Sequence, residues 1–127
     1  MCDVTAPAEL TLPMDAQAPG RARSFLHEAD CQVHQSRVLD EAQLLVSELV
    51  TNAVVHGAPP VAMRVECDGT AGMTVAVSDG SVQSPIADQA GPDAEHGRGI
   101  ALVDLLSERW GVDVTEAGKT TWFRLRQ

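Results

Sequence analysis

Glu48 and Asn52 are the polar residues whose types and spacing best suit chemistry. They lie four residues apart in the stretch LLVSELVTNAVVHG (44–57), which places them on one helical stripe, about 40° apart. A carboxylate there can orient or deprotonate a nucleophile, and an amide oxygen one turn away can ligate a hard cation. The alternative is an ordinary solvated helix edge. Four apolar neighbours are expected to surround the stripe and partly desolvate it, namely Leu44, Leu45, Leu49 and Val55, but the helix alone leaves both interpretations open.

Two further features are candidate ligand sites. Asp79-Gly80 follows the apolar run 75–77; such an Asp either makes a turn or presents a carboxylate to a ligand's donor group. Gly97-Arg98-Gly99 precedes an apolar helical pattern, and uncovered N–H groups at a helix start favour anions. The alternative is a plain helix entry. The spacing matches neither a dinucleotide fingerprint nor a Walker loop, and Gly118-Lys119-Thr120 lacks the upstream glycine of the latter.

Composition narrows the class of protein. The chain has 127 residues and a formal net charge of −9, so one domain is expected, and general binding to nucleic acids or anionic membranes is not. The longest apolar run, 100–103, is far shorter than the ~20 residues of a membrane span. Three widely spaced cysteines without a CxxC pair predict free thiols in a reducing, cytoplasmic compartment.

The hydrophobic pattern predicts the elements that position these residues. Periods of about 3.6 and 2.0 residues distinguish helices from strands. Helices are expected over 18–31, 38–55 and 99–106, and strands over 9–12, 61–67, 73–77, 109–114 and 120–125. This order predicts an α/β (α+β) two-layer sandwich, with a mixed, mostly antiparallel sheet packed against three helices. Residues 1–7 are expected to be a flexible tail, and 8–127 a single domain.

In combination these motifs resemble the Bergerat-fold (GHKL) ATP-binding superfamily, which includes histidine kinases, gyrase and MutL. ELVTNAVVHG, VSDGS and HGRGIALVDLL look most like its small anti-sigma-factor serine kinase branch. The resemblance extends over residues 8–126 and implies a histidine-kinase-like ATPase domain with ATP and Mg²⁺ as cofactors. It also implies a sigma factor and a STAS-domain anti-sigma-factor antagonist as partners, and a possible homodimer.

The resemblance implies a role for each candidate residue. Glu48 would be the general base, Asn52 would ligate Mg²⁺, and Asp79 would accept a hydrogen bond from the adenine amino group. Thr120, or Thr121, would face adenine from the last strand. His56 would contact the nucleotide or cap its helix. The remaining residues of the implied ATP site are Gly80, His96, Gly97, Arg98, Gly99 and Ile100. Gly97 and Gly99, with the helix that they open, would hold phosphate oxygens, and Arg98 or His96 could assist.

One departure from the family keeps a second function open. Better-known members have Asp-x-Gly-x-Gly after the strand, whereas this chain has Ser81 and Gln83 at the two glycine positions. The segment 84–96 would form a lid over ATP. The retained Glu48 and Asn52 favour a kinase, and the lost glycines favour an ATP-gated regulator that binds a partner without phosphorylating it.

A third class, a small metal-binding protein, would use His27, Cys31 and His34. Their spacing of four and three residues places them on one face of a helix. Structural zinc sites usually have four ligands with closer cysteine pairs, so coincidence is the preferred interpretation. Trp110, Trp122 and Phe123 are expected to pack in the sheet.

Overall fold

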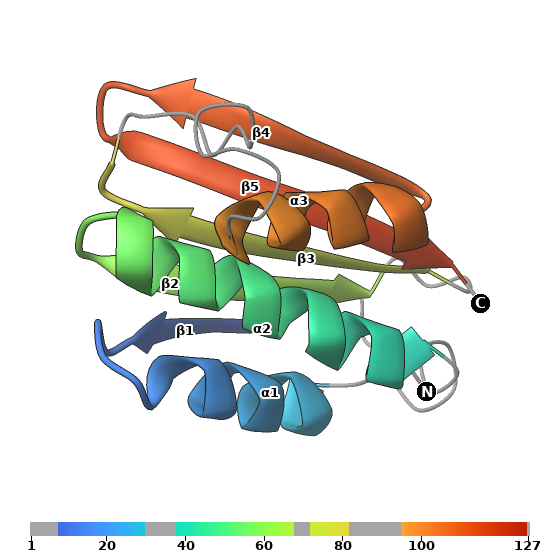
Figure 1. Ribbon diagram of the computed structural model, residues 1–127. Helices are drawn as coiled ribbons and strands as arrows, with labels where there is room; N and C mark the ends of the chain where they lie inside the picture. Colours follow the sequence, from blue (N-terminus) through green and yellow to red (C-terminus); the bar gives the residue numbers. More distant parts are fainter. Residues whose placement is uncertain (1–7, 30–37, 68–71, 82–94, 127) are drawn as a thin grey trace.

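The computed structural model describes residues 8–29, 38–67, 72–81 and 95–126, which form a sheet and a layer of helices on one of its faces (Figure 1). The strands are β1 (Ala8–Leu12), β2 (Val61–Cys67), β3 (Gly72–Asp79), β4 (Arg109–Thr115) and β5 (Gly118–Arg126). The helices are α1 (Ala18–Ala29), α2 (Leu39–His56) and α3 (Glu95–Leu106). The predicted two-layer α+β fold is confirmed.

The sheet has the strand order β1-β2-β3-β5-β4, and all the pairings between its described strands are antiparallel. The sequence predicts a mixed sheet, so this detail is corrected. After β3 the chain passes through α3 and returns to the sheet as β4, and β5 then lies between β3 and β4. The last residue of β3 and the start of β5 are therefore neighbours, and Asp79 lies opposite Lys119 in the register.

The core forms where the inner face of the sheet meets the helices. Strand residues alternate between the two faces, and the buried hydrophobic ones on the inner face are Leu12, Val61, Met63, Val65, Met73, Val75, Val77, Phe123 and Leu125. Helix α2 contributes buried residues at spacings of three and four, namely Ala42, Leu45, Val46, Leu49, Val50 and Ala53. The spacing of three and four residues places these side chains on one side of α2, and this side faces the sheet.

Helix α1 flanks α2 on one side. It begins where the Asp15 carboxylate accepts the Gln17 N–H at 2.8 Å, and Pro19 lies in its first turn, where no N–H partner is lost. The guanidinium of Arg23 donates to Ser47 Oγ at 2.9 Å, and Gln43 Nε2 donates to the Arg23 carbonyl at 3.2 Å. Gln43 and Ser47 therefore mark the flank of α2 that faces α1.

Several boundaries differ from those expected. Strand β3 continues to Asp79, and α3 begins at Glu95 instead of Gly99. Gly97 and Gly99 thus lie inside the helix, although glycine costs about 1 kcal/mol there relative to alanine. The packing of its buried Val103 and the hydrogen bond from Trp110 Nε1 to Asp104 Oδ1 at 2.8 Å secure the later turns of α3.

The expected sheet packing of the aromatic residues is confirmed. Phe123 is fully buried, and Trp110 packs against the core. Trp122 lies over Gly111, where an added Cβ would come within 2.8 Å of the indole. None of the helices in the described ranges is long and apolar enough to cross a membrane.

Candidate functional site

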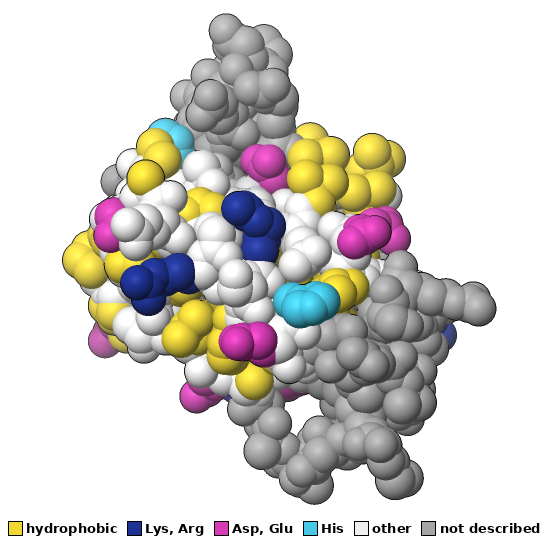
Figure 2. All heavy atoms as spheres, turned by 90° about the horizontal axis from the view of Figure 1, so that it is seen from below, with side chains coloured by type: hydrophobic (Ala, Val, Ile, Leu, Met, Phe, Trp, Pro, Cys, Tyr) yellow, Lys and Arg dark blue, Asp and Glu magenta, His cyan; other side chains and the backbone are white. Residues whose placement is uncertain are grey.

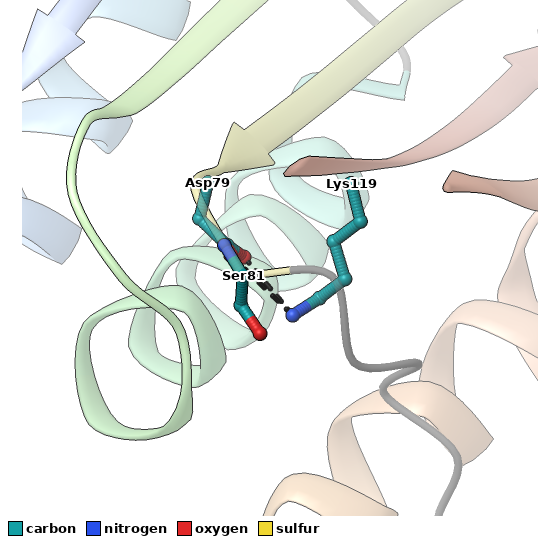
Figure 3. A network of polar contacts seen from close by, with 3 residues as sticks. All are labelled: Asp79, Ser81 and Lys119. Atoms are coloured by element: carbon teal, nitrogen blue, oxygen red, sulfur yellow. Dashed lines mark hydrogen bonds and ion pairs between the residues drawn. The ribbon is translucent and has the colours of Figure 1, made fainter. Parts of the chain in front are cut away.

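The centre of the candidate site is the carboxylate of Asp79 at the end of β3 (Figure 3). Asp79 is buried, at 7% exposure. Its Oδ1 accepts the N–H of Ser81 at 2.7 Å, so the turn expected from Asp-Gly is present. A buried carboxylate normally needs more than one such bond.

Lys119 supplies the second interaction. It lies opposite Asp79 in the β3–β5 register, and its Nζ is 3.2 Å from Oδ2 and 3.4 Å from Oδ1 of Asp79. Both side chains are buried, at 9% and 4% exposure. Lys119 is not among the site residues that the sequence predicts, because the pairing depends on strand register. The sequence does contain one signal for Lys119 as a site residue, namely a lysine in a strand whose other residues are suited to burial.

Two glycines let the backbone approach Asp79 closely. A Cβ on Gly57 would lie 2.6 Å from Asp79 Cγ and 2.5 Å from the Ala53 carbonyl oxygen. Gly118 has φ +145° and abuts the Asp79 backbone, a conformation that favours glycine. The N–H of Gly80 donates to the Ala58 carbonyl at 2.6 Å. The end of α2, the end of β3 and the start of β5 therefore meet at one carboxylate.

Replacing Gly57 by alanine is expected to lower the free energy of unfolding by about 1–3 kcal/mol, as overpacking does. The backbone at Gly57 suits any residue (φ −93°), so the cost arises from displacing Asp79 and Ala53. Chemical denaturation would measure it. Gly20→Ala is the control, because a Cβ there meets only Arg23 Nη2 at 3.6 Å; an equal loss in both variants would contradict the proposed contact.

The two motif residues of α2 lie on its other flank. Glu48 and Asn52 are half-buried and lie about 100–180° around the helix from Gln43 and Ser47. Since α1 and α3 lie on opposite sides of α2 (Figure 1), Glu48 and Asn52 are on the flank that faces α3. Asn52 has an interaction partner within the structure.

The apolar surroundings predicted for this stripe are only partly present. Leu45 and Leu49 are buried, whereas Leu44 and Val55 are exposed, at 44% and 62%. The prediction is wrong for Leu44 and Val55, because they face outward from the helical layer and the sheet covers only the opposite side. His56, in the last turn of α2, is exposed and also has an interaction partner.

The start of α3 carries five of the predicted site residues, His96, Gly97, Arg98, Gly99 and Ile100. They occupy the first two turns, and the first-turn N–H groups have no partner within the helix. The helix packs beside α2 on the inner face of the sheet. The predicted lid, 84–96, falls outside the described residues except for 95 and 96, as does Gln83.

The register separates the two candidate threonines. Thr121 pairs with Val77, is buried at 5%, and shares the inner face with Asp79. Thr120 pairs with Ser78 and faces the opposite side of the sheet, beside Ala62 and Ala76. Because side chains alternate along a strand, Thr121 and not Thr120 lies on the face of the sheet that carries Asp79, and this favours Thr121 of the two predicted threonines.

No group of three or more His, Cys, Asp or Glu side chains suited to a metal is present in the described part of the chain. His27 is exposed on α1, and the face that carries α1 shows basic, acidic and hydrophobic side chains interspersed (Figure 2). Cys31 and His34 lie outside the described residues. The amide oxygen of Asn52 is of a ligand type that hard cations accept, and Mg²⁺ is usually held by one or two carboxylates together with substrate phosphates.

Comparison with known proteins identifies the type of domain. The family model of the histidine kinase-like ATPase domain matches residues 12–125. The fold is similar to the crystal structure of the RsbU and RsbW domains of Rv1364c from Mycobacterium tuberculosis, with a TM-score of 0.71 and 20% identity, over 96% of this chain and 32% of that one. This chain therefore spans about a third of that one.

A second solved structure has a related fold. The histidine kinase domain from the Erythrobacter litoralis EL346 blue-light activated histidine kinase matches with a TM-score of 0.55 and 18% identity, over 90% of this chain and 61% of that one. At these identities the two likenesses establish the fold. No curated protein matches the sequence significantly.

Proposed function

The chain belongs to the histidine kinase-like ATPase domain family, which implies ATP binding, and on this premise we propose that it is a protein-serine kinase of the anti-sigma-factor type. One observation carries the proposal. The Asp79 carboxylate touches both the end of α2, through Gly57, and the start of β5, through Lys119. The helix that bears Glu48 and Asn52 is thereby joined to the residue proposed to read the base.

The positions of the site residues support a binding role for each of them. Asp79 accepts a hydrogen bond from the adenine amino group, and Thr121 faces the base from the same side of the sheet. The N–H groups at the start of α3 hold phosphate oxygens, since a helix N-terminus carries a partial positive charge. Asn52, on the flank of α2 that faces α3, would ligate Mg²⁺. The ion, when bound, would neutralise charge on the transferring phosphoryl group.

The catalytic role falls to Glu48. Its carboxylate accepts the proton of an incoming serine hydroxyl as the serine oxygen bonds to the γ-phosphorus and the bond to the ADP oxygen breaks. Glu48 is half-buried on the flank of α2 that faces α3, and this position supports its proposed role as the base. Asn52 lies one turn later on the same stripe and would ligate Mg²⁺.

The partners proposed are a sigma factor, which the protein sequesters, and a STAS-domain antagonist, which it phosphorylates on serine in the cytoplasm. The likeness of the fold to the RsbW-containing structure and the resemblance of the α2 and α3 motifs to the anti-sigma branch support this proposal. Fold alone does not determine function, so partner identity needs its own experiment.

The test is transfer of phosphate from Mg·ATP to STAS-domain proteins, with phosphoserine detected by mass spectrometry. Stoichiometric phosphoserine on one of them is the expected result. A chain that binds ATP, transfers no phosphate to any of them, and binds a sigma factor differently with ATP and ADP would instead be the ATP-gated regulator. Ser81, which stands at a family glycine position and donates its N–H to Asp79, is the observation that favours that alternative.

A further inference from the structure

Lys119 is a buried ammonium group whose hydrogen-bonding capacity is only partly used. A lysine ammonium has three N–H donors. In the described part of the chain its Nζ meets only the two carboxylate oxygens of Asp79, at 3.2 and 3.4 Å. Burial of a charged donor without acceptors is costly. The remaining donors therefore need an acceptor from outside these residues.

The position of the ammonium indicates where that acceptor would come from. Figure 3 shows Lys119 Nζ and the Asp79 carboxylate side by side, at the start of β5 and the end of β3, close to Ser81. A buried ion pair is weak evidence for stability, since desolvation offsets much of the attraction. A donor and an acceptor 3.2 Å apart at the same edge of the sheet can, however, bind one ligand at two points.

We propose that Lys119 and Asp79 together read the Watson–Crick edge of adenine, with Asp79 accepting from the exocyclic amino group and Lys119 donating to ring nitrogen N1. This inference rests on the proposed nucleotide site and adds Lys119 to it as a specificity-determining residue. The Asp79 carboxylate keeps its bond to Ser81 and its pairing with Lys119, since a carboxylate has about four acceptor positions.

The chemistry of the base edge matches this pair. The amino group and N1 of adenine are attached to the same carbon, so a donor and an acceptor stand next to each other. Guanine in the same pose presents the reverse order, a carbonyl oxygen toward Asp79 and an N–H toward Lys119. Both contacts would then be repulsive, so the pair discriminates by repulsion as well as by attraction.

The deciding measurement is the affinity of the unmodified chain for Mg·ATP and for the Mg complex of 1-deaza-ATP, in which a C–H replaces N1. Loss of a hydrogen bond to a charged donor is expected to weaken binding about 10- to 100-fold. The 7-deaza nucleotide, altered away from this edge, is the matched control and should bind like ATP. Equal binding of ATP and 1-deaza-ATP, or equal weakening by both analogues, would overturn the proposal.

A variant ties the effect to Lys119. In Lys119→Met the preference for ATP over 1-deaza-ATP should fall to less than about threefold. The substitution in the protein and the replacement of N1 in the nucleotide remove the same contact, so their effects should not add. Lys119→Arg, which retains a charged donor, should keep a preference. A preference that persists undiminished in Lys119→Met would contradict the assignment. If the methionine variant does not fold, the comparison of nucleotides on the unmodified chain still decides.

The two failures are distinguishable. A chain that binds no ATP refutes the proposed function itself. A chain that binds ATP and is indifferent to N1 refutes only the role of Lys119, since Asp79 and the start of α3 would still hold the nucleotide.

Discussion

Replacing Glu48 by glutamine is expected to leave Mg·ATP affinity unchanged and to lower the rate of phosphoryl transfer by about 10²- to 10⁴-fold, the usual contribution of a general base. Glutamine has nearly the same shape, so the packing of this half-buried position is preserved, but its amide cannot take up the serine proton. Single-turnover formation of phosphoserine would measure the rate, and calorimetry the affinity.

Glu41→Gln is the matched control for this variant. Glu41 is exposed in the first turn of α2 and lies about two turns before Glu48 on nearly the same flank, so its loss tests the effect of charge alone. It should transfer phosphate at the parental rate. A parental rate in Glu48→Gln would show that another group is the base.

Replacing Asn52 by alanine is expected to weaken Mg·ATP binding by at least about 100-fold, to beyond easy detection. The variant removes the single protein ligand proposed for Mg²⁺, and the ion is what neutralises the phosphates against a chain with a net charge of −9. Because alanine is the better helix former, α2 should stay folded. Calorimetric titration with Mg·ATP would measure the loss.

Thr51→Ala is the control at the adjacent position. Thr51 is half-buried and points about 100° away from Asn52 around α2, so it shares the helix but not the proposed metal. It should bind Mg·ATP like the parent chain. If the two variants lost affinity equally, the effect would come from α2 as a whole and the ligand assignment would fail.

The elements that carry the site follow closely from the sequence. The helix predicted over 38–55 is observed as Leu39–His56, and the strand predicted over 61–67 is observed with those bounds. Both have strong periodicity and clear terminators, with Gly57 after the helix and Pro59-Pro60 before the strand. Hydrophobic period is the strongest local signal of structure, so these predictions needed no tertiary information.

The interactions around Asp79 could not be predicted in the same way. Its pairing with Lys119, and the choice between Thr120 and Thr121, both depend on the β3–β5 register. A shift of one residue moves each side chain to the other face of the sheet, and no local pattern fixes the register of strands about forty residues apart.

The exposure of α2 and the start of α3 also depend on tertiary contacts. Leu44 and Val55 are exposed because neither faces the sheet, although their types favour burial. Gly97 and Gly99 mark a helix start in the sequence but lie inside α3. Helix propensity is a weak preference that packing overrides. The helix itself was therefore predicted correctly, but its first residue was not.

We propose that the meeting point of α2, β3 and β5 is an adenine-specific, magnesium-dependent nucleotide site. Calorimetry on the purified chain with Mg·ATP, Mg·GTP and ATP without metal tests this proposal. We expect one Mg·ATP per chain, Mg·GTP weaker by at least about tenfold, and little heat without the metal. No binding at millimolar Mg·ATP, or equal binding of Mg·ATP and Mg·GTP, would contradict it.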